Sequence, residues 1–114
     1  MKREAPPLTV YVDVDNTLVS LVGNKRAPIP DMVAHVRDLH RQGARLYCWS
    51  SVGADYARRV AEELRVVECF VGFLPKPHVI LDDQTIKDWS YFLHFYPSQS
   101  TSFTVNDYRA ALEK

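Results

Sequence analysis

The chain has 114 residues, of which 46% are hydrophobic and 25% are charged. This is enough apolar material for one core, and the length leaves no room for a second domain of ordinary size. Fourteen basic and fourteen acidic side chains balance, so the overall charge gives no signal for nucleic acid or an anionic membrane as a partner. We therefore treat residues 1–114 as a single domain.

The N-terminal segment and the cysteines exclude several further classes of protein. Residues 1–7 are polar and contain prolines, and no apolar run approaches the roughly 20 residues that a membrane span needs. We therefore expect a cytoplasmic protein without a membrane partner. Cys48 and Cys69 are too few for a disulfide framework, and Cys48 lies in an apolar run that favours a buried thiol.

Apolar runs with strand and helix patterns alternate along the chain. Runs rich in β-branched and aromatic residues predict four strands, over residues 8–14, 44–49, 69–74 and 78–81. Apolar residues at helical spacing predict helices over residues 30–42, 53–64 and 84–93, and a last helix capped by Asn106-Asp107 and ending at Leu112, after a polar break at 97–102. Gly23-Asn24 suits a tight turn, so a small hairpin flap is expected over about residues 18–29.

Strands that alternate with helices favour parallel βαβ units with helices on both faces of the sheet. The expected fold class is therefore α/β, a three-layer, Rossmann-like open parallel sheet.

Polar residues follow the predicted strands at the edge where ligands bind in such sheets. They are Asp13 and Asp15 after the first strand, Ser50 after the second, Lys76 before the fourth, and Asp82 and Asp83 after it. Carboxylates packed together repel one another unless a cation compensates them, and an all-oxygen ligand set suits Mg²⁺. A lysine and a hydroxyl nearby match the charge of a phosphoryl group, and a carboxylate can act as a nucleophile toward phosphorus.

The run Asp13-Val14-Asp15-Asn16-Thr17 resembles the DxDxT signature of the haloacid dehalogenase superfamily. Ser50, Lys76 and the pair Asp82-Asp83 resemble the second, third and fourth motifs of that family, in the same order, within residues 8–88. Two departures stand out. Asn16 replaces a glycine that many relatives have, a change that asparagine tolerates, and the five residues between Lys76 and Asp82 leave no room for a helix.

The resemblance implies a Mg²⁺-dependent phosphomonoester hydrolase that forms an aspartyl-phosphate on Asp13. Asp15 would act as general acid and then as general base, while Ser50 and Lys76 would hold the phosphoryl oxygens. The implied metal ligands are Asp13, the backbone carbonyl of Asp15, and the pair Asp82-Asp83, in which Asp83 is favoured. Asp88 is left outside the metal set.

Neither gap between the motifs holds a cap domain, so the resemblance is to a small capless member of the family with an open site. Such a site suits a phosphorylated substrate that can be macromolecular, or a homo-oligomer in which a neighbouring copy supplies the lid. Two rival hypotheses are a noncatalytic phosphate-binding or scaffold module of the same fold, and a receiver-like phospho-acceptor domain.

The histidines and the aromatic residues near Trp89 are expected to lie outside the proposed site. His35 and His40 are expected on the surface of a helix, and His78 is expected to be structural. The aromatic residues near Trp89 are expected to pack over the sheet, with a partner-binding surface as the alternative; they are Tyr91, Phe92, Phe95 and Tyr96.

Overall fold

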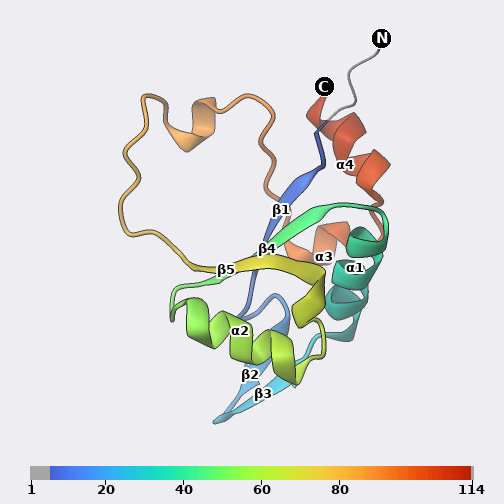
Figure 1. Ribbon diagram of the computed structural model, residues 1–114, viewed down its shortest axis with the longest axis vertical. Coiled ribbons are helices and arrows are strands. Elements are labelled where there is room, and N and C mark those ends of the chain that lie inside the picture. Colours follow the sequence, from blue (N-terminus) through green and yellow to red (C-terminus); the bar gives the residue numbers. More distant parts are fainter. Residues whose placement is uncertain (1–5, 114) are drawn as a thin grey trace.

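The computed structural model describes residues 6–113, and its centre is a parallel three-stranded sheet (Figure 1). The strands β1 (Thr9–Asp13), β4 (Arg45–Ser50) and β5 (Phe70–Pro75) lie side by side in that order. The structure thus confirms a mixed α/β fold with a parallel sheet, compatible with a Rossmann-like arrangement. In the register, Asp13 lies opposite Trp49, and Ser50 lies opposite Pro75. All three strands therefore end at the same edge.

Two helices connect these strands and cover one face of the sheet. Helices α1 (Pro30–Arg41) and α2 (Ala54–Glu63) agree with the predicted helices over 30–42 and 53–64. The connections β1–α1–β4 and β4–α2–β5 step in the same direction across the sheet, and right-handed crossovers then place both helices on the same face. Accordingly, the Arg37 guanidinium on α1 donates a hydrogen bond of 3.2 Å to the Leu64 carbonyl at the end of α2. The prediction that helices cover both faces is wrong for these two helices.

The core lies between this face and the two helices. Alternate strand residues, Val12, Leu46 and Cys48, are buried against the apolar sides of α1 and α2. Burial raises the pKa of the Cys48 thiol to about 12, with the nearby Asp13 carboxylate as a smaller cause. Cys48 is therefore a protonated, buried thiol at neutral pH, as the sequence predicted.

A hairpin follows the first strand, as predicted for residues 18–29. Strands β2 (Val19–Val22) and β3 (Lys25–Pro28) pair antiparallel around Gly23, whose φ of 61° suits a tight turn. Leu18 and Val19 at its base are fully or almost fully buried. Burial of this base anchors the flap to the core.

The C-terminal segment packs beside α1. Short helix α3 (Pro97–Ser100) replaces the predicted polar break, and α4 (Val105–Leu112) is capped by Thr104, which replaces the expected cap at Asn106-Asp107. A threonine three residues before an acid forms a reciprocal capping box, which explains the earlier start of α4.

His35 is buried rather than exposed as predicted, because its ring makes a 2.7 Å hydrogen bond with the Tyr108 hydroxyl on α4. Burial lowers the His35 pKa, and the charge of Asp38 only partly opposes this. His40 is exposed, as expected.

The chain after β5 forms a long loop over residues 76–96, which extends away from the sheet (Figure 1). The predicted strand over 78–81 is wrong: these residues are outside any strand, and the exposed fractions of Val79 and Leu81 are 74% and 96%. A parallel strand would have to start at the opposite edge of the sheet, and the two residues between β5 and position 78, Lys76 and Pro77, are too short a crossover for that. The predicted helix over 84–93 is reduced to one 3₁₀ turn, η2 (Ile86–Asp88).

The aromatic residues of this loop do not pack over the sheet as a group. Tyr91 and Tyr96 are exposed, whereas the Phe95 ring lies 5.2 Å from that of Phe103 and 5.5 Å from that of Tyr108. Phe95 therefore packs against the C-terminal segment. Across residues 6–113, no helix is long and apolar enough to cross a membrane.

Candidate functional site

The carboxyl ends of the three strands bring together the first three predicted motifs. Asp13 ends β1, Ser50 ends β4, and Lys76 follows the last residue of β5. The Lys76 amide donates a 2.9 Å hydrogen bond to the Ser50 carbonyl. This bond continues the strand pairing past the end of β5 and holds the backbone of Lys76 beside that of Ser50.

The central contact of the site is an ion pair between Lys76 and Asp13. Lys76 Nζ lies 3.1 Å from Asp13 Oδ1, and both side chains are about one-third exposed, at 34% and 33%. Thr17 Oγ1 lies at 3.5 Å from the other carboxylate oxygen, Oδ2. A partly exposed pair of this kind contributes only about 0–1 kcal/mol to stability. Its importance is that it holds a carboxylate and a cation together at the edge where ligands bind.

The turn after β1 is fixed by its own backbone. The amides of Thr17, Leu18 and Val19 all point to the Val14 carbonyl, and the Asn16 amide donates to the Val19 carbonyl at 2.6 Å. Asn16 has a φ of 63°, a left-handed conformation that asparagine tolerates better than most residues. The predicted replacement of glycine is therefore compatible with the turn.

Asp15 is held by a residue that the sequence did not single out for the site. The Tyr56 hydroxyl on α2 donates a 2.6 Å hydrogen bond to Asp15 Oδ1. Burial raises the Tyr56 pKa, and the hydrogen bond to Asp15 raises it further, so the phenol remains a donor at neutral pH. Apolar spacing predicts Tyr56 as a packing residue of α2. Its place in the first turn of α2, directly after the end of the second strand, is the signal that could have identified it.

Arg26 connects the flap to this tyrosine. Its guanidinium carbon lies 5.4 Å from the centre of the Tyr56 ring, and its Nη2 forms a 2.6 Å ion pair with Glu63 Oε1. The flap, α2 and Asp15 are thus linked through Arg26 and Tyr56.

Ser50 is present at the strand end, but its hydroxyl points elsewhere. Ser50 Oγ accepts a 3.0 Å hydrogen bond from the Val52 amide, and the residue is only 2% exposed. This is the turn-capping role that a serine before a helix commonly has. Ser50 therefore contributes to the site through its backbone carbonyl, which accepts the hydrogen bond from the Lys76 amide.

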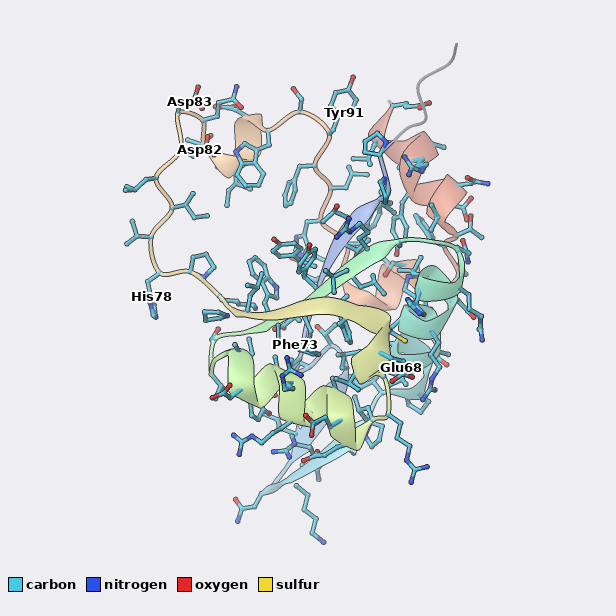
Figure 2. The ribbon with its side chains drawn as sticks, in the orientation of Figure 1. Glu68, Phe73, His78, Asp82, Asp83 and Tyr91 are labelled. Atoms are coloured by element: carbon cyan, nitrogen blue, oxygen red, sulfur yellow. The ribbon has the colours of Figure 1, made fainter. Side chains whose placement is uncertain are left out.

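Asp82 and Asp83 are not brought to the strand ends. Both are exposed on the loop over residues 76–96, far along it from β5 (Figure 2). Asp82 Oδ1 accepts a 2.9 Å hydrogen bond from the Gln84 amide, which closes a local turn. The placement follows from the missing fourth strand, since these residues were expected at its end.

The predicted Mg²⁺ ligand set is therefore only half assembled. Asp13 and Asp15 lie at the sheet edge, and Lys76 already compensates the charge of Asp13. Among residues 6–113, no group of three or more histidine, cysteine, aspartate or glutamate side chains is arranged to hold a metal ion. The residues as placed do not form the expected site of Asp13, the backbone carbonyl of Asp15, Asp82 and Asp83, and we assign no chemical step to a metal.

Comparison with known proteins leaves the family open. No family model matches the chain, and neither a curated protein nor a solved structure matches it.

Proposed function

We propose that the protein hydrolyses phosphate monoesters with Asp13 as the nucleophile. The observation that supports this best is the 3.1 Å ion pair between Lys76 and Asp13 at the carboxyl edge of a parallel sheet. A phosphoryl group that approaches Asp13 there meets an ammonium group whose charge matches its oxygens. The order of motifs around Asp13, similar to that of the haloacid dehalogenase superfamily, favours the same reaction.

In the first step, a carboxylate oxygen of Asp13 attacks phosphorus and the bond to the ester oxygen breaks. Asp15 donates its proton to the leaving oxygen, so that an alcohol departs and an aspartyl-phosphate remains. Asp15, now a carboxylate, takes a proton from water as the water oxygen attacks phosphorus. The acyl–phosphate bond then breaks, inorganic phosphate leaves, and Asp13 and Asp15 return to their starting protonation states.

Three other features support individual parts of this proposal. Lys76 offsets the negative charge that collects on the phosphoryl oxygens, and Thr17 lies beside the nucleophile. Tyr56 keeps Asp15 in one orientation. Mg²⁺ is a proposed cofactor on the strength of the family resemblance, and its ligands would include Asp83 only after the loop over residues 76–96 changes its path.

A noncatalytic phosphate-binding module is the second candidate. It is favoured by two observations: the Ser50 hydroxyl is bound to Val52, and Asp82 and Asp83 lie on the distant loop. Such a module would bind phosphate through Lys76 and would not turn over an ester.

The test is hydrolysis of p-nitrophenyl phosphate with Mg²⁺ or with EDTA, by the wild-type chain and by Asp13→Asn. We expect metal-dependent release that is lost in Asp13→Asn and kept in a control, Asp31→Asn, which changes an exposed acid in the first turn of α1. Acid quenching during turnover should leave one phosphoryl group on the peptide that contains Asp13. Normal activity of Asp13→Asn would exclude this mechanism, and phosphate binding without any release would favour the binding module.

A further inference from the structure

The face of the sheet opposite α1 and α2 carries a group of three aromatic side chains, which we call the aromatic face: Tyr11, Tyr47 and Trp49. They occupy the alternate positions of β1 and β4 that do not enter the core. Tyr11 lies opposite Tyr47 in the register, and Trp49 lies opposite Asp13. The Tyr11 ring is 5.3 Å from the Tyr47 ring and 4.9 Å from the Trp49 ring.

This aromatic face borders the proposed site. Lys76 Nζ lies 5.9 Å from the centre of the Trp49 ring and 3.1 Å from Asp13 Oδ1. Asp13 follows Tyr11 at the next alternate position of β1, so both start from the same side of the strand. One cation thus contacts both the proposed nucleophile and the edge of the aromatic face.

Part of the aromatic face is open to a ligand. Tyr11 is 47% exposed, and its ring meets that of Trp49 edge to face at an interplanar angle of 86°. On the neighbouring strand, Gly72 has no side chain, and a Cβ there would lie 3.5 Å from the Tyr47 ring. The sheet therefore presents rings beside a charged pair, with no side chain of Gly72 above them.

We propose that the aromatic face binds the planar ring of a phosphate monoester while Lys76 and Asp13 engage its phosphoryl group. The inference rests on the proposed function and names its substrate class: monoesters of alcohols that carry a planar ring, either a nucleoside or an aryl group. Charge complementarity selects this ligand, because the ammonium that borders the rings attracts the phosphate and Tyr11 offers a ring surface for stacking. A ligand without a ring would use only the charged half of the site.

Two matched pairs of ligands test the proposal. AMP and ribose 5-phosphate differ in whether a base or a hydroxyl group stands on the sugar, and phenyl phosphate and cyclohexyl phosphate differ in the planarity and aromaticity of the ring. The alcohols released from the second pair also differ in acidity, so the pairs are compared by binding. Binding is followed by Trp49 fluorescence in the full chain carrying Asp13→Asn, which stops turnover, and Trp89→Phe, which removes the other tryptophan. Turnover of each ligand is followed by phosphate release from the wild-type chain.

We expect at least one planar ligand to bind about tenfold more tightly than its partner, the size typical of one stacked ring. Tyr11→Ala should remove this difference and Tyr11→Phe should keep it. Tyr91→Ala, which changes an exposed tyrosine on the distant loop (Figure 2), should have no effect. A preference in the AMP pair alone identifies a nucleoside ligand, and a preference in the phenyl pair identifies an aryl ligand.

The two proposals fail in different ways. Turnover with equal binding within each pair would overturn the aromatic-face proposal and leave the proposed function intact. Ring-selective binding without turnover of any ester would support the aromatic-face proposal and exclude hydrolysis. The comparison within each pair uses no variant of the aromatic face, so it decides the question even where Tyr11→Ala fails to fold.

Discussion

Tyr56 connects the chemistry of Asp15 to the packing of α2, because its hydroxyl is 2.6 Å from the Asp15 carboxylate. Tyr56→Phe removes this bond and leaves the ring in place. Hydrogen bonds to charged groups are worth about 1.5–3 kcal/mol, so we expect kcat to fall by about tenfold or more. KM should change little, because Tyr56 has its hydrogen bond with Asp15 and none with the Asp13–Lys76 pair.

Esters with different leaving groups show whether Tyr56 positions the general acid Asp15 or has only a structural role. A phenol leaves less readily than p-nitrophenol and needs more help from a general acid. The loss in Tyr56→Phe should therefore be larger for phenyl phosphate than for p-nitrophenyl phosphate. Tyr96→Phe, at an exposed position, is the control. Equal losses for both esters would contradict the assignment of Tyr56 to Asp15.

His35 should make the stability of the protein depend on pH. Burial lowers its pKa in the folded chain below the ordinary 6.5. Above pH 6.5 the ring is neutral in both states and its contribution is complete. As the pH falls below 6.5, the unfolded chain binds a proton that the folded chain does not, so unfolding becomes more favourable.

Urea unfolding at pH 7.5 and pH 5.5 checks this prediction. The wild-type chain should lose more stability between the two values than His35→Gln, whose amide does not titrate in this range. His40→Gln changes an exposed histidine of the same helix and should behave like the wild-type chain. If His35→Gln loses as much stability as the wild-type chain, another group controls the pH dependence.

At the scale of elements, the sequence predicted β1, β4, β5, α1, α2 and the flap, and the structure confirms them within one or two residues. These elements have strong local signals: apolar runs for the strands, helical spacing for the helices, and Gly23-Asn24 for the turn. Asp13, Ser50 and Lys76 could be placed at one edge because parallel strands end together. The approach of Lys76 to Asp13 follows from the same topology.

The strand over residues 78–81 could not be judged from local pattern. Its residues have high strand propensity, but pairing requires an edge within reach, and the chain leaves β5 at the carboxyl edge of the sheet. The burial of His35 and the contact of Tyr56 with Asp15 were not predicted, for a related reason. Helical spacing shows which side of a helix is buried, but it does not identify the polar residue that packs against that side. This residue is Asp15 for Tyr56 and Tyr108 for His35.

At the scale of the whole molecule, α1 and α2 cover one face of the sheet, and the other face carries the aromatic face beside the proposed site. The order β1-β4-β5 leaves β1 at an edge. The loop over residues 76–96 adds several exposed apolar side chains, including Val79 and Leu81. Exposed apolar side chains are typical of sites that bind a ligand or another surface, and the aromatic face contributes Tyr11 to them, with 47% of the residue exposed.

The position of the loop over residues 76–96 also determines whether Asp83 can join the proposed Mg²⁺ ligands. Without the loop, the implied ligands are the Asp13 carboxylate, which is paired with Lys76, and the backbone carbonyl of Asp15. These two oxygen ligands make a weak site for a divalent cation. The family resemblance assigns a further ligand to Asp83. If Mg²⁺ supports hydrolysis through that ligand, the loop must bring Asp83 to the sheet edge, and Asp83→Asn should raise the Mg²⁺ concentration that gives half-maximal activity.

Asp88→Asn is the matched control, because it changes another exposed acid of the same loop. The asparagine can still accept the hydrogen bond that Asp88 receives from the Thr85 hydroxyl at 3.0 Å. We expect the Mg²⁺ titration of Asp88→Asn to match that of the wild-type chain, and the titration of Asp83→Asn to shift by about tenfold, the loss typical of an altered ligand environment. Identical titrations of all three chains would assign the cation to Asp13 and Asp15, with the loop remaining where the structure places it.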